Sequence, residues 1–285
     1  MPVGVVDIGS NTCRLLVAQI EGSAIVPLEK GRVRLPLGEE IERTGGVSET
    51  SIAAAAKAGR KLCSIARRRG VDELDVFLTA PGRQSANADA LVDALRRATK
   101  HAVRVLTTEE EGRLAYAGAV ATADVPLRGA LAVCDVGGAS TEIAIGTPST
   151  SPDWVGSVDL GSVRLTARAE SLADAVKEAR AAFHGVEPQR VGTALCVGGT
   201  ARATRRLVGP WLGDAELKEA LRLVETTSPR DLSKRFGVDR ARAEILPAGV
   251  AILSAVHELL DVPLHVCSGG IREGAVLASL AERAA

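Results

Sequence analysis

The most informative stretch of the chain is Leu131-Ala-Val-Cys-Asp-Val-Gly-Gly-Ala-Ser-Thr-Glu-Ile-Ala-Ile-Gly146. It predicts an apolar strand that ends at Asp135, a turn at Gly137 and Gly138, and a second strand that carries Glu142. The two glycines can take positive φ and bring backbone N–H groups close to an anion. Two carboxylates beside a phosphate site favour a bound divalent cation. The alternative is a β-hairpin whose glycine turn has no chemical role.

A second copy of this pattern lies near the N-terminus, in Val5-Val-Asp-Ile-Gly-Ser-Asn-Thr-Cys-Arg-Leu-Leu-Val17. It aligns without gaps with residues 133–145, so that Asp7 corresponds to Asp135 and Thr12 to Ser140. A repeated strand, Asp-x-Gly turn and strand predicts two related halves whose polar turns face each other across a cleft. The cleft is therefore the candidate site.

The length of 285 residues agrees with two α/β domains. We place them at residues 1–122 and 123–285, with a hinge at 124–129 and with the terminal helix free to pack back on the first domain. The strand-like start lacks the features of a secretory signal, and no apolar run approaches the roughly 20 residues of a membrane span. These features predict a soluble, cytoplasmic protein.

Composition limits the possible partners. The formal net charge is +0 and aromatic residues make up 2% of the chain, which disfavours nucleic-acid binding. The five cysteines and four histidines lack the spacing of a zinc site, so we expect the cysteines to be buried, reduced thiols. Anion recognition must then come from local arginines.

Local signals predict the other elements that flank the cleft. A helix over 49–69 follows the N-cap Ser48, and Arg83 is expected in a loop at the carboxyl end of a strand over 75–79. The helix over 107–121 begins with a capping box, either Thr107 with Glu110 or Thr108 with Glu111, and capping alone could explain these glutamates. We further expect a strand-like segment over 155–166, a helix over 168–183, and a helix over 240–260 that is bent at Pro247.

Several motifs now occur in a fixed order: Asp7-Ile-Gly-Ser-Asn-Thr, Arg83-Gln-Ser-Ala-Asn, Glu110-Glu-Gly-Arg-Leu-Ala-Tyr-Ala-Gly118, Asp135-Val-Gly-Gly-Ala-Ser-Thr-Glu142, Leu160-Gly-Ser-Val-Arg-Leu-Thr, Gly198-Gly-Thr and Gly269-Gly-Ile-Arg-Glu-Gly. Over almost the entire chain, this set resembles the exopolyphosphatase and guanosine pentaphosphate phosphatase family. The resemblance implies an actin-like, sugar-kinase-like fold of ribonuclease H-like topology. Two α/β domains of related topology then flank a phosphate-binding cleft.

The resemblance also implies roles for individual residues. Glu111 matches the catalytic base, Asp135 and Glu142 match acidic positions linked to metal and activity, and Asp7 falls on a phosphate-loop position. We expect Asp135, with Asp7 or Glu142, to hold Mg²⁺ or another divalent cation. The phosphate-binding positions fall on Ser10, Asn11, Thr12, Arg83, Gly137, Gly138 and Ser140. Arg14 and Arg164 are further candidates for phosphate contact, with a solvated or structural ion pair as the alternative for each. The sequence departs from the family pattern at Ala139, which replaces a third glycine, at Pro81 and Gly82, and at Gly112.

The implied activity is exopolyphosphatase-type release of terminal phosphate from inorganic polyphosphate. Short chains are favoured, because the sequence ends without the helical C-terminal region of longer members. The alternatives are a guanosine pentaphosphate phosphatase with a role in the stringent response, an ATP-dependent sugar kinase or ATPase, and a non-catalytic sensor of polyphosphate or an alarmone. The partners are polyphosphate or guanosine pentaphosphate, without nucleic acid or membrane, and a homodimer is left open.

Overall fold

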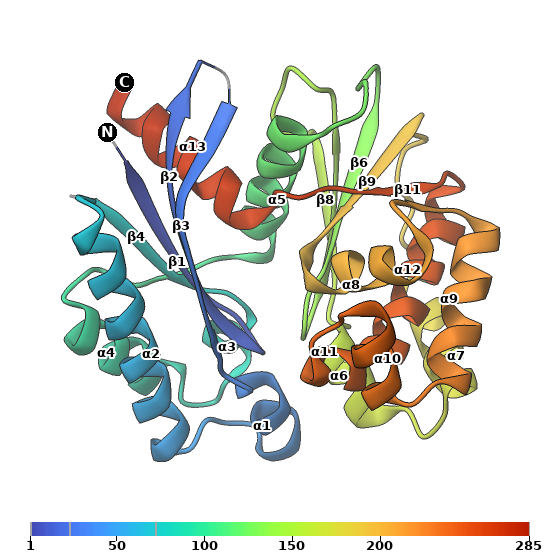
Figure 1. Cartoon of the computed structure of the whole chain (residues 1–285), viewed down its shortest axis with the longest axis horizontal. Helices are drawn as coiled ribbons and strands as arrows, with labels where there is room; N and C mark the ends of the chain where they lie inside the picture. The colour runs from blue at the N-terminus through green and yellow to red at the C-terminus, as the bar shows by residue number, and fades with distance from the viewer. Residues whose placement is uncertain (1, 23, 72, 285) are drawn as a thin grey trace.

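The computed structural model describes residues 2–22, 24–71 and 73–284, and it contains two β-sheets side by side with helices around each (Figure 1). Met1 and Ala285, the outer limits of the two predicted domains, lie outside the described residues. The first sheet has the order β3-β2-β1-β4-β5. Its strands are β1 (Val3–Ile8), β2 (Thr12–Glu21), β3 (Ala24–Arg34), β4 (Leu74–Leu78) and β5 (Arg104–Val105).

The second sheet repeats this plan with the order β10-β11-β9-β6-β7-β8. In each sheet an antiparallel hairpin is joined to a parallel strand, and the register pairs Asp7 with Arg14 in one hairpin and Asp135 with Glu142 in the other. The prediction of two related halves is therefore confirmed. The strands are β6 (Leu131–Val136), β7 (Thr141–Gly146), β8 (Trp154–Val158), β9 (Thr193–Val197), β10 (Trp211–Leu212) and β11 (Leu264–Val266).

Helices cover both faces of each sheet, and two of them are exchanged between the halves. Alternate residues of β1 face opposite cores, so that Val6 packs toward α2 (Glu49–Arg68) and α4 (Ala88–Thr99), whereas Val5 packs with Val276 of α13 (Ile271–Ala284). The helix α5 (Thr108–Thr122) lies on the second sheet instead, in a core with β6, β7 and β9. The terminal helix thus packs back on the first sheet. The exact domain limits stay a prediction.

The exchanged helices α5 and α13 cross at glycines (Figure 1). A Cβ atom at Gly118 would overlap the carbonyl oxygen of Gly270, and one at Gly274 would overlap the carbonyl oxygen of Leu114. Only residues without a side chain allow the two helix backbones to approach this closely. The crossing therefore fixes α5, which carries Glu111 in its first turn, against the start of α13.

Several local predictions are corrected by tertiary contacts. The segment predicted as strand-like over 155–166 is a strand only to Val158 and then forms the helix α6 (Ser162–Arg168). Arg83 belongs to a short helix, α3 (Ala80–Gln84), and not to a loop. The predicted helix over 168–183 begins later, as α7 (Leu172–Ala182), and α1 (Leu37–Thr44) lies where no helix was expected.

The remaining helices enclose the second sheet. The bend expected at Pro247 is a break at Ile245 between two helices, α11 and α12. All five cysteines are free and buried, as predicted. In the ranges that the structure describes, no helix combines the length and apolar character needed to cross a membrane. The bounds are α8 (Gly198–Val208), α9 (Asp214–Thr226), α10 (Pro229–Phe236), α11 (Arg240–Glu244) and α12 (Leu246–Leu260).

Candidate active site

The turns of the two repeated hairpins touch across the cleft. Each is closed by the same backbone hydrogen bond, from Gly9 N to Thr12 O in one and from Gly137 N to Ser140 O in the other, both at 3.0 Å. A Cβ atom at Gly138 would lie 2.9 Å from the Cβ of Ser10. The expectation that the polar turns face each other is therefore confirmed.

Glycine is required at positions 137 and 138 for a reason other than the predicted positive φ. Gly137 and Gly138 are not among the described glycines with positive φ. They are needed for space, because a Cβ at Gly137 would lie 2.9 Å from Ser140 O and one at Gly138 would press on Ser10. Close approach of two backbones, and not a left-handed conformation, is what requires glycine at these two positions.

A pocket of about 110 Å³ lies between the turns, which we call the reaction pocket. Its position matches the strand ends, where α/β sheets place ligands. The further candidate Arg14 lines it, whereas Arg164 lies outside it in an ion pair with Glu42, and all of the other predicted site residues except Arg83 line it. These are Asp7, Ser10, Asn11, Thr12, Glu111, Asp135, Gly137, Gly138, Ser140 and Glu142.

The carboxylates of the reaction pocket are poorly solvated. Burial raises the pKa of Asp135 to about 6 and that of Glu142 to about 7, and it also raises the pKa of Asp7. Asp7 raises the pKa of Asp135 further, since two negative charges repel each other. Arg202 opposes the shift of the Asp135 pKa only in part, so the charge of the ionised carboxylate is incompletely compensated, and a cation would compensate it further.

This donor set fits Mg²⁺ that is completed by substrate. No group of three or more His, Cys, Asp or Glu side chains within the described chain is arranged to hold a metal ion. Mg²⁺, however, is commonly bound through one or two carboxylates, with waters and substrate phosphates as the other ligands. Asp7 and Asp135 come from equivalent strands and line the same pocket, so they suit that role.

Glu111 lies on the first turn of α5 and is 4% exposed. Burial and the nearby Glu142 raise its pKa well above the usual value, while Arg83 opposes the shift. A carboxylate with a raised pKa in a pocket is suited to accept a proton near neutral pH.

The neighbouring Glu110 performs the capping. Its carboxylate accepts a hydrogen bond from Thr107 N at 2.7 Å, and Thr107 Oγ1 accepts one from Glu110 N at 3.1 Å. Of the two capping boxes considered, the structure contains the one between Thr107 and Glu110. Glu111 is therefore free of this capping role.

Arg83 contacts the candidate base and does not line the reaction pocket. Its guanidinium donates to a carboxylate oxygen of Glu111 and, at 2.6 Å, to the carbonyl oxygen of Leu106. The Nη2 atom of Arg83 is buried and has no partner among the described residues. The phosphate-binding role of Arg83 stays a prediction.

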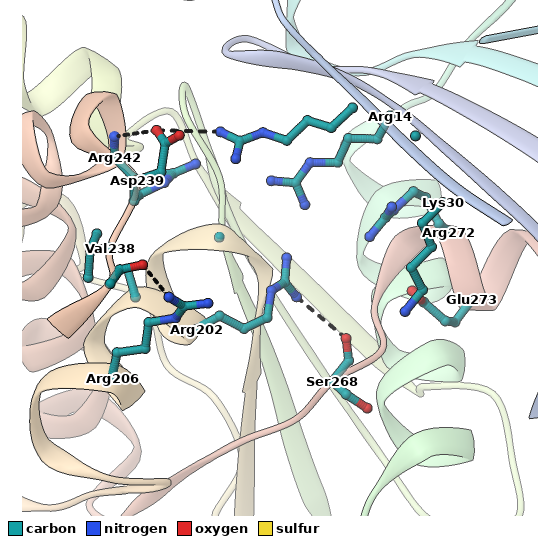
Figure 2. Close-up of a pocket in the computed structure, with 15 residues that line it drawn as sticks. Arg14, Lys30, Arg202, Arg206, Val238, Asp239, Arg242, Ser268, Arg272 and Glu273 are labelled. Carbon is teal, nitrogen blue, oxygen red and sulfur yellow. Dashed lines mark hydrogen bonds and ion pairs between the residues drawn. The ribbon is translucent and has the colours of Figure 1, made fainter. Parts of the chain in front are cut away.

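A larger cavity of about 600 Å³ adjoins the reaction pocket and is strongly basic, a feature that the sequence analysis did not find (Figure 2). We call it the basic cavity. It shares Arg14 and Arg242 with the reaction pocket, and a small pocket lined by Asp7, Asp135 and Arg272 connects the two further. Against only two acidic side chains, its wall has seven basic ones: Arg14, Lys30, Arg32, Arg202, Arg206, Arg242 and Arg272.

The arginines of the basic cavity are crowded. Burial and neighbouring arginines lower the pKa of Arg14 to about 9 and that of Arg242 to about 10, and the pKa of Arg202 is lowered for the same reasons. A polyanion would relieve this repulsion. The sequence signal was the spacing of Arg202 and Arg206 on α8, which directly follows the glycines at 198 and 199. Only the fold brings β2, β3 and α13 to the same cavity.

Two related sheets, facing glycine turns with carboxylates and a basic cavity define a phosphate-handling α/β protein with two similar halves. Residues 16–211 match the model of the Ppx/GppA phosphatase family. The chain belongs to this family, whose members hydrolyse phosphoanhydride bonds. The family and the enzyme class, a hydrolase acting on such bonds, are as predicted.

Individual relatives agree with this assignment. The guanosine-5'-triphosphate,3'-diphosphate pyrophosphatase of Pseudoalteromonas atlantica is 30% identical and aligns with 96% of this chain, which spans only 58% of that relative's length. Exopolyphosphatase 1 of Mycobacterium leprae is 26% identical, and the alignment covers 98% of this chain and 90% of that relative's length. The crystal structure of the Aquifex aeolicus member of the Ppx/GppA family has a TM-score of 0.84 at 24% identity, covering 99% of this chain and 98% of that one. This similarity confirms the predicted fold class.

Proposed function

We propose that the protein is an exopolyphosphatase-type phosphohydrolase that releases terminal phosphate from inorganic polyphosphate, with short chains as its substrates. The observation that supports this is the junction of the reaction pocket and the basic cavity through shared residues. When the terminal phosphate of a polyphosphate lies in the reaction pocket, the other phosphate groups of that molecule lie in the basic cavity. Inorganic polyphosphate carries negative charge along its whole length and offers no base to stack, which suits a wall rich in arginine and without aromatic side chains.

In the proposed mechanism, the protein orients water and stabilises charge on the transferred group. Glu111 accepts the proton of the attacking water, and Arg83 fixes its carboxylate. The hydroxyl groups of Ser10 and Ser140, with backbone N–H groups of the turns, bind the phosphate oxygens. Asp7 and Asp135, with Glu142 beside them, would hold Mg²⁺, which when bound neutralises charge on the phosphate oxygens.

Guanosine pentaphosphate is the second candidate substrate. The volume of about 600 Å³ lies within the range of small-molecule sites, roughly 300–1,000 Å³, so the basic cavity has room for more than a linear chain. The name of the Pseudoalteromonas atlantica relative also refers to such a nucleotide. The 3'-diphosphate of that nucleotide would suit the arginines of the cavity.

Phosphate release from a panel of substrates tests the proposal. We expect release from short polyphosphates in the presence of Mg²⁺, with less from long chains and from guanosine pentaphosphate. A preference for the nucleotide would establish the second candidate instead. Binding of polyphosphate without release would overturn the enzymatic proposal and favour a sensor. Arg222→Met is a matched control for arginine substitutions, since Arg222 is exposed on α9 and its ion pair is with Glu219 of the same helix.

A further inference from the structure

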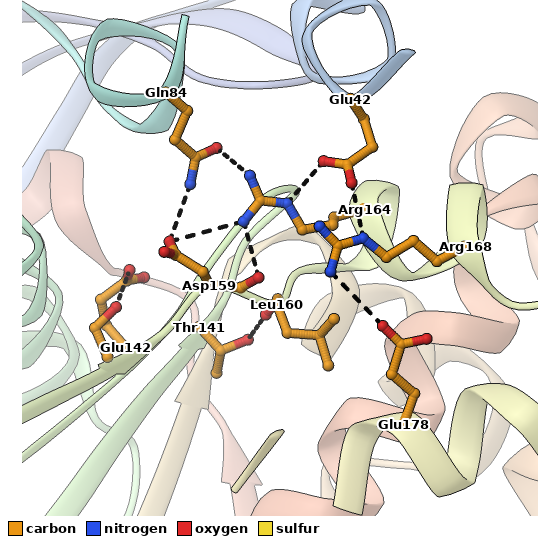
Figure 3. A network of polar contacts seen from close by, with 10 residues as sticks. Glu42, Gln84, Thr141, Glu142, Asp159, Leu160, Arg164, Arg168 and Glu178 are labelled. Carbon is orange, nitrogen blue, oxygen red and sulfur yellow. Dashed lines mark hydrogen bonds and ion pairs between the residues drawn. The ribbon is translucent and has the colours of Figure 1, made fainter. Parts of the chain in front are cut away.

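A polar network joins the two halves at a place outside both pockets (Figure 3). Glu42 of α1, in the first half, accepts hydrogen bonds from Arg164 Nε at 2.8 Å and from Arg168 Nε at 2.7 Å. Both arginines belong to α6 in the second half. Burial alone would raise the pKa of Glu42, but the two arginines outweigh it and hold the pKa below the usual value. Glu42 is therefore ionised and anchors α6.

The two helices joined by this network each support one glycine turn. At the start of α1, Gly38 N donates to Ser10 O at 2.7 Å, and a side chain at Gly38 would press on Ser10. At the start of α6, the backbone N–H groups of Val163 and Arg164 donate to Gly138 O at 2.8 and 3.1 Å. A shift of α1 relative to α6 would therefore move the two phosphate-facing turns relative to each other.

Arg164 also reaches α3, the helix whose Arg83 contacts the candidate base Glu111. Its Nη2 donates to Gln84 Oε1 at 2.8 Å, and its Nη1 donates to the carbonyl oxygen of Asp159 at 2.8 Å. Gln84 follows Arg83 in α3, and the guanidinium of Arg83 contacts Glu111. One guanidinium from the second half is thus bonded to both first-half elements that position the reaction pocket, α1 and α3.

We propose that Arg164 is a positioning residue that aligns the two phosphate-binding turns and the Arg83–Glu111 pair for the reaction. The inference rests on the proposed phosphohydrolase function. Arg164 is suited to the task because its side chain is 11% exposed and its planar guanidinium donates in three directions at once. Arg168 shares the partner Glu42 but is 47% exposed and pairs otherwise with Glu178 of α7. Within the described part of the chain it has no hydrogen bond to α3, so it provides a matched comparison.

Steady-state kinetics of phosphate release test the positioning role. Arg164→Met should lower kcat by about 10²-fold, the effect expected of a misplacement of about 1 Å, and should leave KM within about threefold because the basic cavity is unchanged. Arg164→Lys keeps the positive charge but loses the planar guanidinium that donates in three directions. We therefore expect an intermediate kcat for this variant. Arg168→Met should have nearly wild-type kinetics. If Arg164→Met lowers the melting temperature yet retains wild-type kcat and KM, the residue is only structural and the proposal is wrong.

A distance measurement tests the same inference without activity. Cysteines introduced at the exposed Lys57 of α2 and Lys177 of α7 can carry spin labels, because all the native cysteines are buried. Arg164→Met should broaden or lengthen the distance distribution between the labels, whereas Arg168→Met should leave it narrow. An unchanged distribution in Arg164→Met would overturn the alignment role. Absence of phosphate release by the wild-type chain would instead reject the proposed function and leave this readout intact.

Discussion

Replacement of Glu111 by glutamine tests whether the candidate base takes part in the reaction. Glutamine has nearly the same shape and can still accept the hydrogen bond from Arg83, but it cannot take a proton from water. A general base typically contributes about 10²–10⁴-fold in rate, which is roughly 3–5 kcal/mol of barrier. The variant loses the helix-dipole contribution of about 0.3–1 kcal/mol and the charge attraction of the buried ion pair with Arg83. It also removes an ionised carboxylate that burial and Glu142 disfavour, and this gain offsets the two losses. We therefore expect turnover to fall at least about a hundredfold without loss of thermal stability.

Glu110→Gln is the matched control for this experiment. Glu110 lies on the same helix turn and shares its dipole, but its side chain is 45% exposed and serves the capping box, which glutamine can also complete. Phosphate release and binding of polyphosphate are measured for both variants. Equal losses at both positions would indicate a general electrostatic effect, and wild-type turnover in Glu111→Gln would refute the assignment of the base.

Three further predictions concern the pocket, the cavity and the helix crossing. Because burial raises the folded-state pKa of Asp135 from 3.8 to about 6, the group contributes about 3 kcal/mol of stability to the metal-free protein below pH 3.8, and this contribution disappears as the pH rises through about 6. Asp135→Asn should remove that part of the pH dependence of the melting temperature, and an unaltered pH profile would contradict it. Arg202→Met should raise KM for polyphosphate, more at low than at high salt, with little change in kcat. If the variant and the wild type have the same KM at low salt, the basic cavity does not bind polyphosphate as proposed. Gly118→Ala should lower the free energy of unfolding by about 1–3 kcal/mol in denaturant titrations, because the added methyl group overlaps the backbone of α13, whereas Gly192→Ala has space and should be neutral.

The hairpins were predictable because their signal is local. An apolar strand, an Asp-x-Gly turn and a second strand all lie within about a dozen residues, and the internal repeat then predicted that Asp7 and Asp135 would meet. The helix α6 was not predictable in this way. Its N-cap is Gly161 without a capping side chain, and its first N–H groups are satisfied by carbonyl oxygens of the turn at 137–138, more than twenty residues earlier. Its start is therefore fixed by a tertiary contact.

The helix α1 and the basic cavity were also not predicted from the sequence, for different reasons. The helix α1 does carry local signals, namely acidic residues in its first turn, Leu37 and Ile41 on one buried face, and Gly45 in the left-handed conformation at its end. The helix is only 8 residues long, however, which is shorter than the roughly 11 residues over which such spacing indicates a helix. The basic cavity had no compact motif at all. Its cations come from β2, β3, α8, α11 and α13, so neighbours in space such as Arg14 and Arg272 are more than 250 residues apart in the chain. Only knowledge of the topology could place them together.

The opposed pKa shifts of the two neighbouring pockets give a physical reason to expect that metal and polyanion bind together. In a chain with a formal net charge of +0, carboxylates with raised pKa values lie beside arginines with lowered ones, and both groups are poorly solvated. A cation alone would compensate Asp135 but would add to the repulsion felt by Arg14, and a polyanion alone would do the reverse. A phosphate chain that brings Mg²⁺ with it satisfies both sets at once. The charges therefore favour the metal-bound form of the substrate over either component, which agrees with the proposed metal-assisted hydrolysis.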